Sequence, residues 1–536
     1  MITEQDSAAN FSHNAVAIVD FGSQFTQLIA RRVREHGVFC RIYPCTTSVE
    51  EIVSLSAVGP GGSTGGDGLA TSLKGIILSG GPRSVYAADA VAVQPELLEA
   101  GVPVLGICYG LQATIQLLGG GVDRGSGGGE YGRTEFKTDA LPGVPPSSVV
   151  WMSHGDQVVR LPDGFRTLGS SESCPFAAVE GLDGRFLGLQ FHPEVSHTEY
   201  GSAILKYFLH DLCGAEQSWE MGTFLEDATA TVRRQVGENP VICGLSGGVD
   251  SSTLAVLLHR ALGERLTCIF VDNGLLRKGE AQQVQDTFGS SFGIRLRHVD
   301  AADEFLSALA GVEDPEEKRR RIGELFIEIF SREARALGGA GFLAQGTLYP
   351  DVIESVAAHG GPTATIKTHH NVGGLPDDLK FELVEPFREL FKDEVRELGR
   401  RLGLSEDIVA RHPFPGPGLA VRIPGEVTRK KLSVLREADA IFRHELTESG
   451  WMARTSQAFC VLLPVRTVGV MGDERTYENV LALRCVDTTD FMTADWSRLP
   501  SDLLAKVSSR IINEVAGINR VVYDISSKPP ATIEWE

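Results

Sequence analysis

The sequence lacks long apolar runs, closely paired cysteines and an excess of basic residues. No stretch of about 18 consecutive apolar residues occurs, so we expect no transmembrane helix and no membrane partner. Residues 1–14 carry no Lys or Arg and no apolar core of the signal-peptide kind, and we expect a disordered tail there. Fifty Lys and Arg against seventy Asp and Glu give a net charge of −20, which disfavours nucleic acid as a partner.

The nine cysteines are dispersed, and no two of them form a Cys-x-x-Cys pair. An odd, scattered set of cysteines is typical of a reducing compartment, so we expect a cytoplasmic protein without a zinc ribbon. The adjacent His369 and His370 lack a third ligand at helical spacing, and we predict no zinc there either. With 536 residues and 42% apolar residues, the chain is predicted to be globular with two to four domains.

The most informative stretch is the loop Ser246–Ser252, which reads SGGVDSS. The apolar run 241–245 before it predicts a buried parallel strand, and leucines and alanines at helical spacing over 254–262 follow it. A glycine turn from a strand into a helix points backbone N–H groups at an anion. Asp250 is a candidate Mg²⁺ ligand beside phosphate oxygens. The loop has no Gly-Lys-Ser/Thr, which excludes a Walker A motif.

This pattern resembles the pyrophosphate loop (PP-loop) of the ATP pyrophosphatases, which cleave ATP between the α and β phosphates. The resemblance implies an adenine-nucleotide α-hydrolase-like domain that uses ATP and Mg²⁺. It also implies contacts from the whole loop, from the backbone of Val271 at the end of a second strand, and from Lys392. The implied ATP contacts are Ser246, Gly247, Gly248, Val249, Asp250, Ser251, Ser252, Val271 and Lys392. The alternative is an ordinary Gly/Ser turn between a strand and a helix. Such turns are common, but they do not usually match all seven residues of the loop together with the strand before it and the helix after it.

The first third of the chain predicts a second α/β domain. Strand-like runs at 15–20, 74–79 and 103–107 alternate with helical patterns, which indicates a doubly wound parallel sheet with its chemistry at the carboxyl strand ends. The third run leads into GICYG at 106–110, which has the form of a nucleophile elbow around Cys108. A helix N-terminus there would favour the thiolate.

A cysteine nucleophile needs a base, and His192 is the first candidate. The apolar run 186–191 ends in His192, Pro193 and Glu194, and residues two apart in an extended chain share a face. Glu194 can therefore orient the imidazole that pairs with Cys108. His154 is a second candidate that ranks below His192, although Asp156 follows it two residues later. Taken singly, each of these residues also fits a structural role.

Residues 15–213 resemble a class I glutamine amidotransferase domain. The resemblance implies that Cys108 attacks the glutamine amide to form a thioester, and that the backbone N–H groups of Gly81 and Tyr109 form the oxyanion hole. Two stretches depart from the family pattern: 56–71 is rich in Gly and Ser and longer than this family usually has, and 119–129 is unusually glycine-rich. We expect both to be flexible surface loops.

The last third begins at a Pro/Gly-rich boundary, HPFPGPGLAVR at 412–422, and continues as an α+β pattern. It ends in KPPATIEWE at 528–536, whose Trp, Ile and Pro-Pro predict a docked tail in place of a frayed one. We therefore predict four segments: a tail at 1–14, an amidotransferase domain at 15–213, an ATP pyrophosphatase domain at 214–411, and a dimerisation and substrate domain at 412–536.

Together these parts resemble the family of glutamine-hydrolysing GMP synthetases across nearly the whole chain. The resemblance implies that XMP, ATP, glutamine and water give GMP, AMP, diphosphate and glutamate through an adenylated XMP. It implies XMP contacts from Arg319, Lys367, Gln457, Lys528 and Glu534, and a homodimer through the C-terminal domain.

Three alternatives remain. NAD synthetase shares the pyrophosphate loop but usually takes its ammonia from a nitrilase-type domain without the elbow. A tRNA-thiolating pyrophosphatase would want a basic face and often a Cys-x-x-Cys pair. A non-catalytic nucleotide-sensing scaffold would have lost the nucleophile or the loop, and both are intact.

Overall fold

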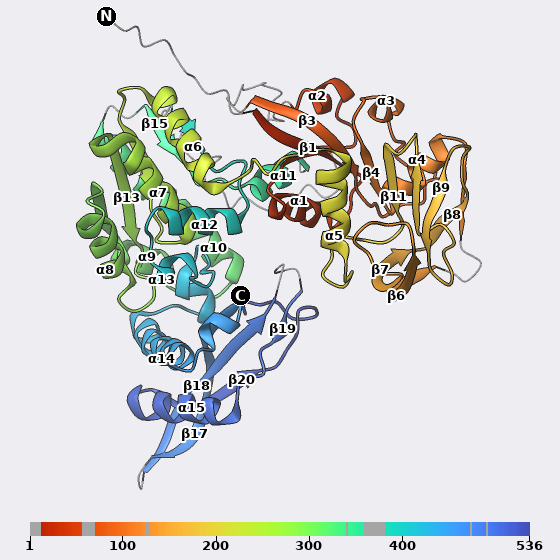
Figure 1. The fold of residues 1–536 in the computed structure, drawn as a ribbon. Coiled ribbons are helices and arrows are strands. Elements are labelled where there is room, and N and C mark those ends of the chain that lie inside the picture. Colours follow the sequence, from red (N-terminus) through yellow and green to blue (C-terminus); the bar gives the residue numbers. More distant parts are fainter. Residues whose placement is uncertain are drawn as a thin grey trace, which may run out of the picture. The chain divides into compact units, whose positions relative to one another are not determined.

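The computed structural model describes residues 12–55, 70–124, 129–338, 341–357, 381–471, 474–488, 491 and 493–536. The chain divides into two compact units (Figure 1). The first contains Met1–Phe224 and Pro350–Ala364, and the second contains Leu225–Tyr349 and Thr365–Glu536. Among the described helices, none combines the length and apolarity that a membrane crossing needs.

The first unit is built on a nine-stranded sheet in the order β2-β1-β3-β4-β11-β10-β9-β6-β7. The first five strands run parallel, as predicted, and the sheet continues beyond β11 as antiparallel strands. The strands are β1 (Ser12–Asp20), β2 (Phe39–Pro44), β3 (Ala70–Leu78), β4 (Val104–Ile107), β6 (Glu130–Thr138), β7 (Ser147–His154), β9 (Arg166–Ser170), β10 (Ala178–Gly181) and β11 (Phe186–Leu189). The helices are α1 (Thr26–Glu35), α2 (Val49–Val53), α3 (Pro95–Leu98), α4 (Tyr109–Leu117) and α5 (Gly201–Lys206), continued by the π-helical turn Tyr207–Leu212.

Two boundaries in this unit differ from the prediction. Strand β1 begins at Ser12, because β3 starts early enough to pair Ser12 with Ala70, so the predicted tail includes three strand residues. The stretch 119–129 is not wholly a loop, because its residues Gly121–Arg124 form β5, which pairs with β8 (Asp156–Arg160). Residues 1–11, 56–69 and 125–128 lie outside the described part.

The second unit carries a five-stranded, fully parallel sheet in the order β14-β13-β12-β15-β16. Its strands are β12 (Val241–Gly244), β13 (Leu266–Asp272), β14 (Leu296–Asp300), β15 (Phe342–Ala344) and β16 (Glu382–Val384). Its helices include α7 (Val249–Leu262), α8 (Glu280–Val284), α9 (Ala302–Ala308), α10 (Pro315–Leu337), α12 (Lys392–Arg401) and α13 (Glu406–Val409). Helices α6 (Met221–Val236) and α11 (Tyr349–Ala357) each span a change of unit.

The C-terminal part of the second unit has its own sheet, as the α+β pattern predicted (Figure 1). The long antiparallel pair β17 (Gln457–Met471) and β18 (Glu474–Asp487) is extended by β19 (Asp495–Trp496) and by β20 (Ile518–Asp524), which runs parallel to β18. Helix α14 (Arg429–Glu448) packs on β17, and α15 (Ser501–Glu514) packs on β20 and α14.

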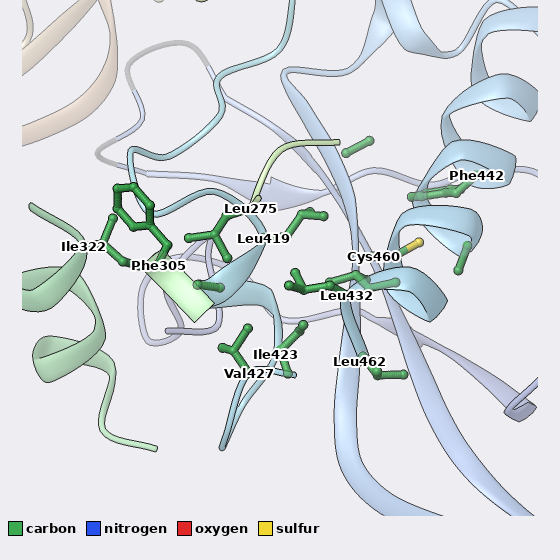
Figure 2. Packing of buried hydrophobic residues seen from close by; sticks show 14 of the residues in the cluster. Leu275, Phe305, Ile322, Leu419, Ile423, Val427, Leu432, Phe442, Cys460 and Leu462 are labelled. Carbon is green, nitrogen blue, oxygen red and sulfur yellow. The ribbon is translucent and has the colours of Figure 1, made fainter. Parts of the chain in front are cut away.

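One apolar core joins the two sheets of the second unit. It contains Ile242 and Ile269 from the parallel sheet, and Leu432 and Cys460 from the C-terminal part. It also contains Leu419 from the Pro/Gly-rich stretch 412–422, the connecting segment between the two sheets, and all five residues are buried. Figure 2 shows Leu275, Leu419, Leu432 and Cys460 within this packing. The sequence boundary predicted at 411–412 therefore marks a change of sheet within one compact unit.

Candidate active sites

Cys108 lies in a strained turn between a strand and a helix in the first unit. It directly follows β4 and precedes α4, and its backbone has φ +49° and ψ −102°, a region that non-glycine residues rarely adopt. Gly110 makes this turn possible, because a Cβ atom there would lie 2.4 Å from the backbone oxygen of Leu78. The turn has the geometry of a nucleophile elbow, as the sequence predicted.

His192 and Glu194 are adjacent and buried beside Cys108. The His192 Nδ1 atom lies 2.7 Å from Glu194 Oε1, and the two residues are 4% and 0% exposed. Burial alone would lower the pKa of His192, but the Glu194 carboxylate and a hydrogen bond with Cys108 outweigh it and raise that pKa to about 10. The imidazole therefore favours its protonated form at neutral pH, which places a positive charge beside the Cys108 sulfur.

His154, the second candidate base, lies in a different environment. Its Nδ1 atom faces the backbone oxygen of Asp156 at 3.0 Å, and its Nε2 atom lies 3.6 Å from Glu130 Oε2. A carboxylate is thus present, from a strand that the sequence argument did not consider. Burial nevertheless lowers the pKa of His154, so this imidazole favours its neutral form. The ranking of His192 above His154 stays a prediction.

The two predicted oxyanion-hole residues are neighbours. A Cβ atom on Gly81 would lie 3.1 Å from Tyr109 Cγ. Tyr109 is the first residue of α4, where backbone N–H groups have no partner within the helix. The preceding Ser79 fixes the loop, because its hydroxyl accepts a hydrogen bond from the N–H of Phe21 (2.9 Å) and donates one to the carbonyl of Gly80 (2.8 Å).

Sequence reasoning missed Gln190 and Gln112. The Gln190 Nε2 atom lies 3.6 Å from Cys108 Sγ, and its Oε1 atom accepts a hydrogen bond from Gln112 Nε2 at 3.2 Å. Gln190 is fully buried and Gln112 is 3% exposed. The two-residue alternation that placed His192 and Glu194 on one face also places Gln190 on it, so a signal was present in the sequence.

The predicted phosphate loop joins β12 to α7 in the second unit. Gly247 has φ +77°, and a Cβ atom there would lie 2.9 Å from Val284 Cγ2, so the turn requires glycine. The hydroxyls of Ser246 and Ser251 are 2.9 Å apart, and Ser246 Oγ accepts from the backbone N–H of Gly248 at 3.3 Å. Backbone N–H and hydroxyl groups thus gather at the start of α7.

Asp250 and Lys392, far apart in the sequence, meet at this loop. Lys392 begins α12, and its Nζ atom lies 3.4 Å from Asp250 Oδ2. Asp250 Oδ1 is buried without a hydrogen-bond partner among the described residues, so this oxygen is available to coordinate a cation. Within the described part of the chain no three His, Cys, Asp or Glu side chains gather for a metal, so an ion here would take further ligands from phosphate and water.

Three further predicted ATP contacts, Ser252, Val249 and Val271, are buried. Ser252 is fully buried, its hydroxyl has no partner among the described residues, and its N–H bonds to the Gly248 carbonyl at 3.0 Å as part of α7. Val249 is also buried, so its side chain packs inside the unit. Val271 lies near the end of β13 beside the loop strand and is 5% exposed, which leaves its backbone as the contacting group.

The C-terminal tail is docked, as predicted, and it brings together several of the predicted XMP contacts. Glu534 accepts two hydrogen bonds from Arg422, at 3.1 and 2.9 Å, and one from Gln457 Nε2 at 2.7 Å. Arg319 donates to the backbone oxygen of Glu536. Lys528 lies elsewhere on the tail and donates to the carbonyl of Phe491 at 2.7 Å.

One partner of the tail was not predicted from the sequence, and one predicted XMP contact cannot be placed. Arg422 is fully buried and stacks on the ring of Phe459, 4.1 Å from its centroid, and no local pattern marks it as the partner of Glu534. The predicted contact Lys367 lies outside the described residues.

Three family models match successive parts of the chain. The description "Glutamine amidotransferase class-I" covers residues 17–212, "NAD synthase" covers 223–321, and "GMP synthase C terminal domain" covers 444–535. The NAD synthase model, over residues 223–321, corresponds to the NAD synthetase alternative raised from the sequence. The GMP synthase C terminal domain model, over residues 444–535, does not.

Several curated relatives match over almost their full length. A protein of Phenylobacterium zucineum is 56% identical over 531 residues, which covers 98% of this chain and 99% of the relative. Proteins of Shewanella piezotolerans and Maridesulfovibrio salexigens are 53% and 54% identical, with 98% of this chain covered in each case and 100% and 99% of the relatives. All three relatives are named "GMP synthase [glutamine-hydrolyzing]".

Proposed function

The chain belongs to the family of glutamine-hydrolysing GMP synthases, and from that premise we propose how its residues divide the reaction. The enzyme makes GMP with glutamine as the nitrogen source. One observation carries the division of roles. The cysteine site and the phosphate loop are separate constellations in separate units, so glutamine hydrolysis and nucleotide activation have their own catalytic groups.

Cys108, His192 and Glu194 hydrolyse glutamine. The Cys108 thiolate attacks the side-chain amide carbon, and the N–H groups of Gly81 and Tyr109 stabilise the oxyanion. His192, which holds a proton at neutral pH because of Glu194, gives that proton to the departing ammonia. Water then attacks the thioester, His192 takes a proton from that water, and glutamate leaves as the Cys108 thiolate returns.

The phosphate loop activates the second substrate. The C2 oxygen of XMP attacks the α-phosphate of ATP, the bond to the bridging oxygen breaks, and diphosphate leaves. Ammonia then displaces AMP from C2 to give GMP. The loop Ser246–Ser252 and Lys392 hold the diphosphate, and the backbone of Val271 lies beside the adenine. Asp250 would hold Mg²⁺, which supplies charge neutralisation at the phosphates when bound.

XMP binds against the C-terminal tail. Arg319, Gln457, Lys528 and Glu534 are the proposed contacts, with Lys367 as a further contact from the part outside the described residues. Two hydrogen bonds hold the tail against the rest of the unit, from Arg319 to Glu536 and from Gln457 to Glu534. They support a tail that is fixed in position before the nucleotide binds. These pairs come from α10, β17 and the tail, so three distant segments supply the proposed substrate site.

The enzyme acts as a homodimer through its C-terminal sheet, in the cytoplasm. Val468, Val470 and Tyr477 support the dimer, because they are 44%, 76% and 60% exposed and lie on one face of the β17–β18 pair, where Val468 is opposite Tyr477. No disulfide joins the nine cysteines, all of which lie in the described part of the chain, and this supports a reducing compartment.

A product assay tests this function. Purified enzyme with XMP, ATP, Mg²⁺ and glutamine is expected to yield GMP, AMP, diphosphate and glutamate, detected by chromatography and a diphosphate assay. Formation of ADP and orthophosphate would contradict the loop assignment. Turnover of nicotinate adenine dinucleotide in place of XMP would contradict the assigned substrate.

A further inference from the structure

Arg411 contacts the phosphate loop from a distant part of the sequence. Its Nη1 atom donates to the backbone carbonyl of Gly247 at 3.0 Å, across 164 residues of sequence. Its Nη2 atom pairs with Glu280 Oε1, and the Arg411 side chain is only 12% exposed. Arg411 ends the pyrophosphatase part, and the next residue, His412, bonds to the carbonyl of Met452 at 2.9 Å in the C-terminal part.

The guanidinium of Arg411 is itself fixed. Glu280 is 4% exposed, and its second oxygen accepts the backbone N–H of Arg277 at 2.9 Å. Glu280 is also the first residue of α8, so the carboxylate that orients Arg411 is anchored to a helix. A charge-assisted pair of this kind leaves the guanidinium one orientation, in which its other nitrogen meets Gly247.

The contact determines which way the loop amides point. A trans peptide is planar, so the N–H of Gly248 points opposite to the C=O of Gly247 in the same peptide group. Arg411 holds that carbonyl on one side, and the Gly248 N–H therefore faces the other side. Ser246 Oγ and Ser251 Oγ lie there, because Ser246 Oγ accepts from that N–H at 3.3 Å and is 2.9 Å from Ser251 Oγ.

We propose that Arg411 is a positioning residue for the phosphate loop, which holds the Gly247–Gly248 peptide with its N–H toward the diphosphate of a bound nucleoside triphosphate. The inference rests on the proposed function of the loop and adds a residue from outside it. Glycine at 247, with φ +77°, gives the loop the freedom to rotate this peptide, so an external contact is needed to choose its orientation.

Substitution of Arg411 tests the inference in an assay driven by ammonium salts, which leaves the glutamine site out. We expect Arg411→Leu to raise the KM for ATP and the inhibition constant of inorganic pyrophosphate by ~10- to 100-fold, the effect of losing a hydrogen bond from a charged donor. The KM for XMP and the basal glutaminase rate should stay within about 2-fold. Arg411→Lys, which keeps one charged donor, should recover part of the pyrophosphate affinity.

The matched control is Arg401→Leu, because Arg401 is an exposed arginine that pairs with Glu397 on α12. It should leave all constants unchanged. If Arg411→Leu does not fold, Glu280→Gln removes the charge that orients Arg411 and should move the same two constants in the same direction by a smaller factor. Unchanged ATP and pyrophosphate constants would overturn the inference, and so would an equal loss for ATP and XMP.

Asp250→Ala separates failure of this inference from failure of the proposed function. If the loop binds ATP, Asp250→Ala abolishes diphosphate release whatever Arg411→Leu does. If Asp250→Ala leaves ATP use intact, the assignment of the loop is wrong. If Asp250→Ala is inactive while Arg411→Leu binds ATP and pyrophosphate normally, only the role of Arg411 is wrong.

Discussion

Cys108 and His192 are both buried, and we propose that they act as a catalytic pair. We expect Cys108→Ala to lower glutamine-driven GMP formation by at least ~10³-fold, because the nucleophile is lost. Activity with ammonium salts should stay within about 2-fold, since the phosphate loop lies in the other unit. Both rates are measured as GMP released. Cys45→Ala, at a half-buried cysteine outside the site, is the control. Loss of both activities would contradict the division of labour.

Glu194 sets the charge of His192. Because its carboxylate is a main cause of a His192 pKa near 10, Glu194→Gln should let the imidazole lose its proton at a lower pH. The rate of Cys108 alkylation by iodoacetamide at pH 7 should then fall by about 10-fold or more, since a neutral imidazole no longer places a positive charge beside the sulfur. The alkylation rate measured across pH 5–10 checks this, and an unchanged profile would contradict the role of Glu194.

The same pKa gives the sign of a stability effect. A His192 pKa raised from 6.5 to about 10 on folding contributes stability that is complete below about pH 6.5 and is lost as pH rises toward 10. The wild type should therefore lose stability across that window, and Glu194→Gln should flatten the loss.

Residues that form local motifs could be predicted, while residues that reach the site from elsewhere could not. The elbow around Cys108 and the i, i+2 pair His192 and Glu194 are visible in short stretches of sequence. The contacts of Arg411 with Gly247 and of Arg422 with Glu534 span 164 and 112 residues, and no local pattern indicates them. Their partners are set by how the connecting segment folds back on the unit.

At the scale of elements, the turn from β4 into α4 depends on close backbone contact. We expect Gly110→Ala to disrupt this turn, because its Cβ atom would lie 2.4 Å from the Leu78 carbonyl oxygen and the backbone would have to move. Glutaminase activity should fall by more than 10-fold, while ammonium-driven activity changes little. Gly289→Ala is the matched control, since a Cβ atom at that position would have no neighbour within 4 Å among the described residues. Full glutaminase activity in Gly110→Ala would contradict the tight turn.

Element types were predictable where an apolar run met a turn signal. The runs at β1, β4, β12 and β13 gave parallel strands at the expected places. The antiparallel strands β6 and β7 were not predicted, because β6 contains no continuous apolar run and the run in β7 is confined to residues 149–152. The small strand β5 within a glycine-rich stretch was missed, since its pairing partner β8 comes more than 30 residues later.

At the scale of the whole molecule, the exposed face of β17 and β18 bears on assembly. We expect Val470→Glu to shift a dimer toward monomer, because a charge would have to be desolvated at a 76% exposed valine on the proposed interface. Sedimentation velocity at micromolar protein measures the shift. Val53→Glu, at a 40% exposed valine on α2, is the control. A dimer that tolerates Val470→Glu would place the interface elsewhere.

The common core of the second unit predicts that its two sheets lose stability together. Leu419 is fully buried in that core, and Leu419→Ala should cost ~2–5 kcal/mol of unfolding free energy. Hydrogen exchange should accelerate in β12 and in β17 to a similar extent, because both strands pack on the same cluster. Faster exchange in one sheet alone would mean that the two parts open independently.

That shared core also limits how this protein can be recombined. A chimera joined at the Pro/Gly-rich segment would pair a pyrophosphatase part from one parent with a C-terminal part from another. The buried residues of Figure 2 would then come from two different proteins and would not be matched in size and shape. The residues of that core all come from Ile242 onward, so the stretch before residue 225 is the part that we expect to be exchangeable. Gene fusions and gene splits in this lineage are accordingly expected between residues 213 and 225, and selection should remove crossovers near residue 412.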